Sequence, residues 1–396
     1  LSMSSCARLV DKNLTIKSVE GQQFTVSRAS DFKTISDNRR SYYNPAMFEV
    51  TMPRSRSSLR IENLIIDDCG THEGSRFIPA EGNGSTNGVI NTDIVQDGII
   101  SLYSLTGAEG EVVLGSGAVL RDFGGMSAVN VSGGKLTMES GSLIEDDKVT
   151  DRAKEVVEDY GAAGAVWCRG GSLEMAFGST IDGVRGRALY VDNGGNAVVN
   201  GAITGSDCDT DMWQGTAGAA VHVRGGSDVT LGSTGTIFGI SEGQCAENDV
   251  PRAIEADSAN FTADAGSVIK QCENVMILHA SSAGDDYKHR IQIDGEISDN
   301  SCGSNSLARS FYGLIVIGQS GTISGNTTTS AGGLLYSNNG SHYIVRGQIT
   351  DNTALLSSML YVANFSGGTS EASIEEGALI SGNNGLGVRV NNGTTV

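Results

Sequence analysis

The hexapeptide GTISGN, residues 321–326, decides how this chain folds. It recurs as GEISDN at residues 295–300 and as GQITDN at residues 347–352. The phrase holds no obvious catalytic group, so its repetition points to architecture. Its isoleucine, or a leucine, recurs along the whole chain, and most spacings lie between 22 and 37 residues. A period in this range, with short alternating segments between the repeats, is typical of a solenoid. The recurring positions are Ile66, Leu120, Ile144, Ile181, Ile203, Ile237, Ile269, Ile297, Ile323, Ile349 and Ile380.

The residues around these markers alternate between apolar and polar side chains. AVNVSGGKLTMESGSLI (128–144) and LYVDNGGNAVVNGAI (189–203) each read as strand, glycine turn, strand, turn and short strand. A helical solenoid would need a period of 3.6 and few glycines, whereas this chain has 54. One coil cannot bury its apolar side, but stacked coils bury it at about 4.8 Å per rung. We predict an all-β parallel β-helix of roughly a dozen rungs, forming one domain over residues 1–396.

One spacing is exceptional. Ile66 and Leu120 are 54 residues apart, and GIISLYSL (98–105) lies between them. The pattern therefore predicts one unmarked rung near this octapeptide.

A second recurring residue lies three positions after the marker. This slot holds Asn300, Asn326, Asn352 and Asn383. Asparagine tolerates a left-handed bend, and its amide can bond to the next asparagine of a stack. We predict an internal column of stacked amides, with each Asn at the bend. Cys69 and Cys272 occupy the same slot, which fits an inward-pointing position.

These repeat phrases resemble the right-handed β-helices of the pectate-lyase-like class, and especially the repetitive bacterial surface proteins and adhesins of that shape. The resemblance covers about residues 9–390 and implies a right-handed coil and an extracellular or cell-surface location. Enzymes of the class carry paired Asp motifs such as Asn-Thr-Asp. That motif occurs at residues 91–93, but its usual downstream partners are missing, so catalysis is not carried over. Both ends of the sequence read as rungs, which predicts a segment of a longer surface protein.

Composition excludes several classes of partner. The 46 acidic residues outnumber the 27 basic ones, giving a net charge of −19 that repels phosphate backbones. No stretch approaches eighteen consecutive apolar residues, so no membrane span is predicted. The expected partner is a glycan or a host surface protein, and the oligomeric state stays open.

The strand before each glycine turn gives the candidate site. Its inward residues are apolar, and period two sends the alternate residues outward. The first outward set alternates aromatic and ionisable side chains, and the second alternates in charge, so the simplest interpretation is an exposed face with a salt-bridge ladder. The first set is Asn130, Trp167, Tyr190, His222 and Glu255, and the second is Ser132, Arg169, Asp192, Arg224 and Asp257.

The longest interruptions of the repeat immediately precede these strands. They span residues 149–163, 207–217 and 241–250, and the first is predicted to contain a short amphipathic helix near 151–160. Loops that flank one face of a sheet build a groove, and aromatic rings in a groove suit sugars. We therefore expect an adhesin-like glycan-binding face. Its predicted ligand-binding residues are Trp167, Arg169, Tyr190, Trp213, His222 and Arg224.

Two alternatives remain open. The same face carries Asp192, Glu255 and Asp257, whose rung spacing predicts carboxylates about 7 to 9.5 Å apart. Such separations suit an inverting glycoside hydrolase, although neighbouring arginines favour ionised carboxylates. The first alternative is therefore a polysaccharide-active glycoside hydrolase or lyase that uses these carboxylates. The other alternative is a structural stalk without a site.

One metal site is conceivable. Asp207, Asp209 and Asp211 open like a calcium loop, but Met212 and Trp213 follow where an EF-hand continues differently. We expect no cofactor, with a looser calcium site as the alternative.

Overall fold

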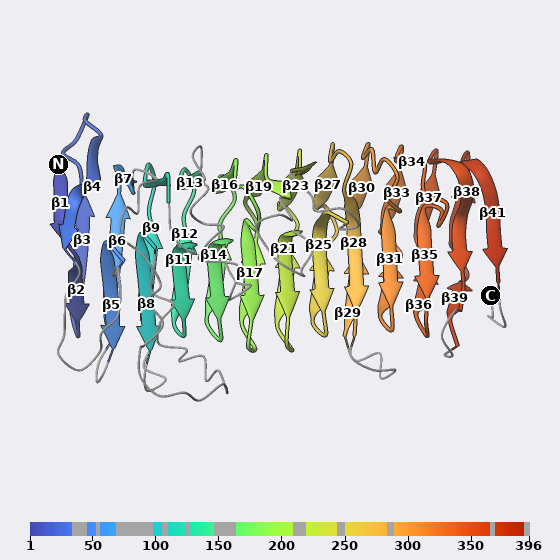
Figure 1. Ribbon diagram of the computed structural model, residues 1–396, viewed down its shortest axis with the longest axis horizontal. Coiled ribbons are helices and arrows are strands. Elements are labelled where there is room, and N and C mark those ends of the chain that lie inside the picture. The colour runs from blue at the N-terminus through green and yellow to red at the C-terminus, as the bar shows by residue number, and fades with distance from the viewer. Residues whose placement is uncertain are drawn as a thin grey trace, which may run out of the picture.

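The computed structural model describes residues 1–33, 46–52, 56–68, 98–104, 110–123, 127–145, 164–208, 219–243, 250–282, 289–364 and 369–391. All regular elements within these ranges are strands. The chain is a right-handed parallel β-helix whose rungs stack along the long axis, with the termini at opposite ends (Figure 1). The predicted fold class is confirmed.

Three long parallel sheets run the length of the solenoid, and each full coil contributes one strand to each. Sheet A contains β1 (Ser2–Ser5), β4 (Phe24–Lys33), β7 (Leu64–Asp67), β10 (Val119–Arg121), β13 (Leu143–Glu145), β16 (Thr180–Asp182), β19 (Ala202–Thr204), β23 (Thr236–Phe238), β27 (Val268–Lys270), β30 (Glu296–Ser298), β33 (Thr322–Ser324), β37 (Gln348–Thr350) and β40 (Leu379–Ser381).

Sheet B contains β2 (Ala7–Val10), β5 (Phe48–Met52), β8 (Ile100–Ser104), β11 (Ser127–Ser132), β14 (Gly164–Arg169), β17 (Leu189–Asp192), β21 (Ala219–Arg224), β25 (Arg252–Asp257), β28 (Met276–Ser281), β31 (Ala308–Phe311), β34 (Thr327–Thr328), β35 (Leu335–Asn338), β38 (Thr353–Val362) and β41 (Asn384–Val390).

Sheet C contains β3 (Asn13–Lys17), β6 (Ser58–Glu62), β9 (Glu111–Leu114), β12 (Lys135–Met138), β15 (Ser172–Met175), β18 (Asn196–Val199), β22 (Asp228–Leu231), β26 (Asn260–Ala263), β29 (Arg290–Ile293), β32 (Leu314–Ile317), β36 (His342–Val345) and β39 (Glu371–Ile374). A separate pair joins β20 (Asp207–Cys208) to β24 (Ser241–Glu242).

The marker residues form one unbroken inner column of sheet A. Each pairs with the next, from Ile66 to Ile380. Leu120 pairs directly with Ile66, so the predicted extra rung between them is wrong. The octapeptide near residue 100 instead supplies β8, the sheet B strand of that rung, and the surplus residues fall between β7 and β8.

Glycine turns separate sheet B from sheet C. Between β21 and β22, Gly225 and Gly226 have φ of 62° and 72°. This left-handed region disfavours side chains with a Cβ, which explains why glycine recurs here. The turn carries the chain around the corner while the apolar side chains on both strands stay inside.

The predicted amide column is present. Asn300 Nδ2 donates to Asn326 Oδ1 at 2.8 Å, Asn326 donates to Asn352 at 2.9 Å, and Asn352 donates to Asn383 at 3.0 Å. Asn300, Asn326 and Asn352 are fully buried, and Cys272 continues the column because its backbone N–H donates to Asn300 Oδ1.

The bend itself is one residue earlier than predicted. Positive φ occurs at Asp299, Gly325, Asp351 and Gly382, each directly before a column asparagine. The left-handed residue turns the chain, and the asparagine after it can then point inward.

The predicted insertions fall partly outside the described residues. Residues 149–163 lie wholly outside them, as do Cys69 and the motif at 91–93. The first residues of the other two insertions form β20 and β24. All three interruptions precede a strand of sheet B, at β14, β21 and β25.

Candidate functional site

One register position on the outer side of sheet B carries most of the unusual side chains. We call it the outward column, and it extends well beyond the residues that the repeats first suggested. Figure 1 shows its strands side by side along the solenoid. Its members pair in the order Asn130, Trp167, Tyr190, His222, Glu255, His279, Arg309, Tyr336, Tyr361 and Arg389.

The part of this column from Trp167 to His279, here called the buried half, is closed to solvent. Trp167 and Tyr190 are each 3% exposed, and Glu255 is 8% exposed. The expectation of an ordinary exposed face is therefore wrong for this set. Period two says on which side of a sheet a side chain lies, but not whether water reaches it. Arg187, which precedes β17, lies 4.8 Å from the Tyr190 ring and helps to cover it.

Glu255 is the charged centre of the buried half. Arg252 Nη1 donates to Glu255 Oε1 at 2.6 Å, and His279 Nδ1 lies 3.5 Å from the same oxygen. His222 Nε2 lies 4.0 Å from the other oxygen. Burial opposes ionisation, but the nearby His279 and His222 rings and the Arg252 cation hold the pKa of Glu255 well below its usual range. Glu255 is thus a carboxylate that cannot act as a proton donor at neutral pH.

His222 is neutral in this setting. Burial and the Arg187 charge lower the pKa of its imidazole to about 3. Neither ring nitrogen has a hydrogen-bond partner within the described part of the chain. Burial likewise lowers the pKa of Arg187 to about 10. This set of groups resembles a desolvated polar core more than an open binding surface.

The second outward set lies at the margin of the buried half. Trp167 Nε1 donates to Asp192 at 3.1 Å, and burial raises the pKa of that carboxyl. Arg224 Nε lies 3.9 Å from Asp257, with both side chains partly exposed. The Arg169 guanidinium lies 5.7 Å from the Trp167 ring. The predicted alternation of charge is therefore present along the edge of the buried half, and Arg224 and Asp257 form its ion pair.

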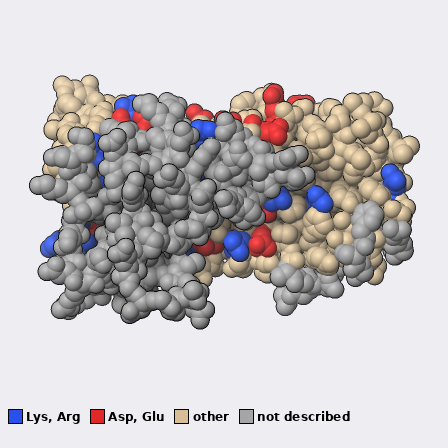
Figure 2. All heavy atoms as spheres, viewed as in Figure 1, with Lys and Arg blue, Asp and Glu red and all other residues tan. Residues whose placement is uncertain are grey.

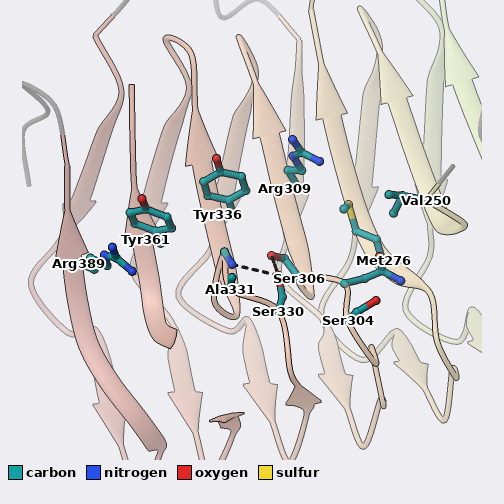
Figure 3. Close-up of a pocket in the computed structure, with 12 residues that line it drawn as sticks. Val250, Met276, Ser304, Ser306, Arg309, Ser330, Ala331, Tyr336, Tyr361 and Arg389 are labelled. Carbon is teal, nitrogen blue, oxygen red and sulfur yellow. Dashed lines mark hydrogen bonds between the residues drawn. The ribbon is translucent and has the colours of Figure 1, made fainter. Parts of the chain in front are cut away.

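The rest of the column, from Arg309 to Arg389, is here called the open half because it borders a hollow, although Tyr361 itself is only 7% exposed. This half lines a hollow of about 440 Å³ on the outer side of strands β31 to β41. Figure 3 shows Arg309, Tyr336, Tyr361 and Arg389 side by side on consecutive strands, with Ser304, Ser306 and Ser330 nearby.

The four column residues of the hollow form a stack. The Tyr336 and Tyr361 rings lie 5.3 Å apart and 20° from parallel. Arg309 lies 5.3 Å from the Tyr336 ring and Arg389 lies 4.7 Å from the Tyr361 ring. The ring faces of Tyr336 and Tyr361 are thus in contact with each other and with the two guanidinium groups. A ligand would meet phenol hydroxyls and guanidinium edges, which are hydrogen-bonding groups.

Among the residues that the structure describes, no acidic side chain lines this hollow. Figure 2 shows that uncharged residues make up most of this face over strands β31 to β41, with isolated basic side chains among them. The open half therefore differs in charge from the chain as a whole, which carries a net charge of −19.

Several predicted site residues lie outside the description. Trp213, Asp209 and Asp211 belong to residues 209–218. Asp207 lies in β20 and accepts a hydrogen bond from the Ser241 hydroxyl. Across the described ranges, no group of three or more His, Cys, Asp or Glu side chains is placed to hold a metal ion. The same part of the chain contains no helix long and apolar enough to cross a membrane.

The sequence reasoning missed the open half. Arg309, Tyr336, Tyr361 and Arg389 continue the register of Trp167 and Glu255, rung by rung. The asparagine-marked repeats after Asp257 fix the register of the next strands. Continuing the outward set through them would have identified Arg309, Tyr336 and Tyr361. Arg389 lies on β41, which pairs with β38 through an irregular register that the pattern does not reveal.

Fold and column together define a parallel β-helix with one chemically distinct face. No protein-family model and no curated protein sequence matches the chain. Among solved structures it is similar to the TibC-catalysed hyper-glycosylated fragment 55–350 of TibA, with 12% identity, a TM-score of 0.26, and coverage of 98% of this chain and 100% of that one.

It is also similar to the A-module of the mannuronan C-5 epimerase AlgE6 from Azotobacter vinelandii. The identity is 11% and the TM-score 0.24, with coverage of 88% of this chain and 90% of that one. Similarities this low carry no argument about function, and the fold assignment rests on the sheets themselves.

Proposed function

We propose that this protein is an extracellular or cell-surface β-helix that binds glycans, in the manner of an adhesin, through the open half of the outward column. The single observation that carries the proposal is the hollow over β31 to β41, where two tyrosines, two arginines and several serines converge. Binding sites are concave and hold a small number of placed polar groups.

The lining suits a ligand rich in hydroxyls. Phenol and serine hydroxyls both donate and accept hydrogen bonds, as sugar hydroxyls do. The Ser306 and Ser330 hydroxyls are 3.2 Å apart, and Ser330 also accepts from the backbone N–H of Gly332 at 3.1 Å. These contacts hold the serine side of the hollow in place before a ligand arrives, which lowers the entropy lost on binding.

The predicted ligand residues of the buried half play a different part in this proposal. Trp167, Tyr190 and His222 are buried on strands that precede the hollow in sheet B, while Arg169 and Arg224 are more exposed. Glycan contact is therefore proposed further along the column than the repeats first indicated.

The proposal is tested by screening the chain against a glycan array and measuring affinity for each hit by calorimetry. Tyr336→Ala and Tyr361→Ala should each weaken binding at least several-fold, because both rings line the hollow. Phe177→Ala is the matched control, since Phe177 is 71% exposed and lies on the turn between β15 and β16. Equal binding by all three variants would exclude this site, and no binding to any glycan would favour the stalk.

A polysaccharide-active enzyme is the second candidate, and one observation favours it. Asp192, Glu255 and Asp257 lie on the outer side of β17 and β25, and burial raises the pKa of the Asp192 carboxyl. Against it, Glu255 is buried and already bonded to Arg252. Reducing-sugar or unsaturated-product release by the wild type, abolished in Asp192→Asn, Glu255→Gln and Asp257→Asn, would establish the enzyme instead.

A further inference from the structure

The described residues supply no counter-charge for the arginines of the open half. Arg309 is partly buried, and its shielded Nε has no hydrogen-bond partner among the described residues. Its guanidinium lies 4.3 Å from the Phe311 ring and 5.3 Å from the Tyr336 ring, and no carboxylate pairs with it in the same ranges. Removing a guanidinium from water without a counter-ion is costly.

Other outward arginines of sheet B are paired with a carboxylate. Arg252 is bonded to Glu255, Arg224 lies 3.9 Å from Asp257, and Arg8 is paired with Glu49. The chain holds 46 acidic and 27 basic residues, yet Arg309 has no such pairing among the described residues.

A second cation lies at the far end of the same stack. Arg389 packs against Tyr361 at 4.7 Å, and the described residues offer it no ion pair. Arg309 and Arg389 are three strands apart in the register, which is about 14 Å at the usual rung spacing. Between them lie two phenol hydroxyls, so a chain-like ligand could meet a cation, two hydroxyls and a second cation in turn.

We infer that the hollow recognises an acidic saccharide, with the carboxylate or sulfate of a sugar unit bound by Arg309 and a further anionic unit bound by Arg389. This inference rests on the proposed glycan-binding function and adds the charge class of the ligand. A guanidinium presents paired N–H donors that match the two oxygens of a carboxylate or sulfate. The anion supplies the counter-charge that Arg309 lacks within the described chain.

The charge is supplied by arginine side chains and not by a bridging cation. The acidic surface of the rest of the chain repels a polyanion at long range, so binding is confined to this hollow. Affinity should survive EDTA and should fall as salt screens the contact.

The test compares matched acidic and neutral glycans by calorimetry on the full chain. Oligogalacturonate is paired with its methyl ester, and dextran sulfate with dextran, so that the two arms separate carboxylate from sulfate recognition. Sialyllactose paired with lactose adds a different sugar skeleton. We expect at least one acidic member to bind and its neutral partner to bind about ten- to a hundredfold more weakly, as the loss of charge-assisted hydrogen bonds implies.

Variants assign the effect to the hollow. Arg309→Met and Arg389→Met should abolish most of the preference for the acidic glycan, and Arg290→Met, an exposed arginine on sheet C, should leave it unchanged. Thermal unfolding of each variant confirms that it is folded.

The possible results distinguish failure of this inference from failure of the proposed glycan-binding function. Equal affinity for acidic and neutral members, with loss of both in Tyr336→Ala, would overturn the inference and leave glycan binding intact. Binding that EDTA abolishes, or that Arg309→Met and Arg389→Met do not change, would also overturn it. If neither the tyrosine nor the arginine variants affect any glycan, the proposed function falls as well.

Discussion

The two halves of the outward column occupy the same register of the same sheet, yet they differ in what surrounds them. In the buried half, Glu255 is bonded to the Arg252 guanidinium, which balances its charge, and two histidine rings lie beside it. In the open half, Arg309 and Arg389 have no such partner among the described residues and border a hollow. Side chains at the same register position can therefore differ in burial and in charge partners. The backbone geometry repeats from rung to rung, but the side chains and loops around each position do not.

The inside of the solenoid changes at nearly the same place. The slot three residues after the marker holds Val184, Ser206, Ile240 and Cys272 beneath the buried half, and asparagines thereafter. The amide column starts at Asn300, which lies between β30 and β31. The strands of the open half therefore belong to the same rungs as the hydrogen-bonded asparagines.

The largest effect is expected for Trp167→Ala in the buried half. Truncating a buried tryptophan leaves a cavity, and the free energy of unfolding should fall by about 3–5 kcal/mol. Trp167 is 3% exposed, contacts Tyr190 and donates to Asp192. Chemical denaturation measures the loss. A variant as stable as the wild type would show that this half is an open surface after all.

Asn326→Ala should have the next largest effect and tests the foundation of the open half. Asn326 bonds to Asn352 and also receives the Asn300 amide, so its loss leaves buried partners unsatisfied. We expect a decrease of about 1–3 kcal/mol in unfolding free energy. Asn383→Ala, at the partly buried end of the column, is the milder comparison, and an equal loss in both would argue against an interior ladder.

Acidification should weaken the buried half. The folded-state pKa of His222 is lowered to about 3, whereas the unfolded chain takes up that proton near pH 6.5. Its contribution is therefore complete above about pH 6.5 and is lost as the pH falls toward 3. At pH 5 the loss should reach about 1–2 kcal/mol. His222→Gln should flatten the pH dependence of the melting temperature, and the control His342→Gln, on sheet C, should not.

The smallest effect on stability is expected in the open half, where function should change instead. Tyr336→Phe removes one hydroxyl from the hollow and keeps the stacked ring, so the unfolding free energy should shift by less than about 0.5 kcal/mol. Affinity for the bound glycan should fall about two- to tenfold, the value of one hydrogen bond. A loss of stability without a loss of affinity would reverse the roles assigned to the two halves.

The sequence predicts the fold well because period and spacing are fixed by the backbone. A strand period of two and coils that stack in register are enough to predict three features. These are the stacking of the marker Ile323, the hydrogen bond of the Asn326 amide and the pairing of Trp167 with Tyr190. The sequence predicts the site only in part. Burial of Trp167 depends on surroundings outside its strand, such as Arg187. The hollow depends on several coils at once, which no single repeat contains.

The most direct test of the account uses one arginine from each half of the same sheet. Arg224 lies at the margin of the buried half, where the repeats alone place the ligand, and Arg309 lies in the open half. Arg224→Met and Arg309→Met should be titrated with the tightest-binding acidic glycan in one calorimetric experiment. The account predicts that Arg309→Met loses most of the affinity while Arg224→Met keeps it. Loss of affinity in Arg224→Met with full affinity in Arg309→Met would contradict it.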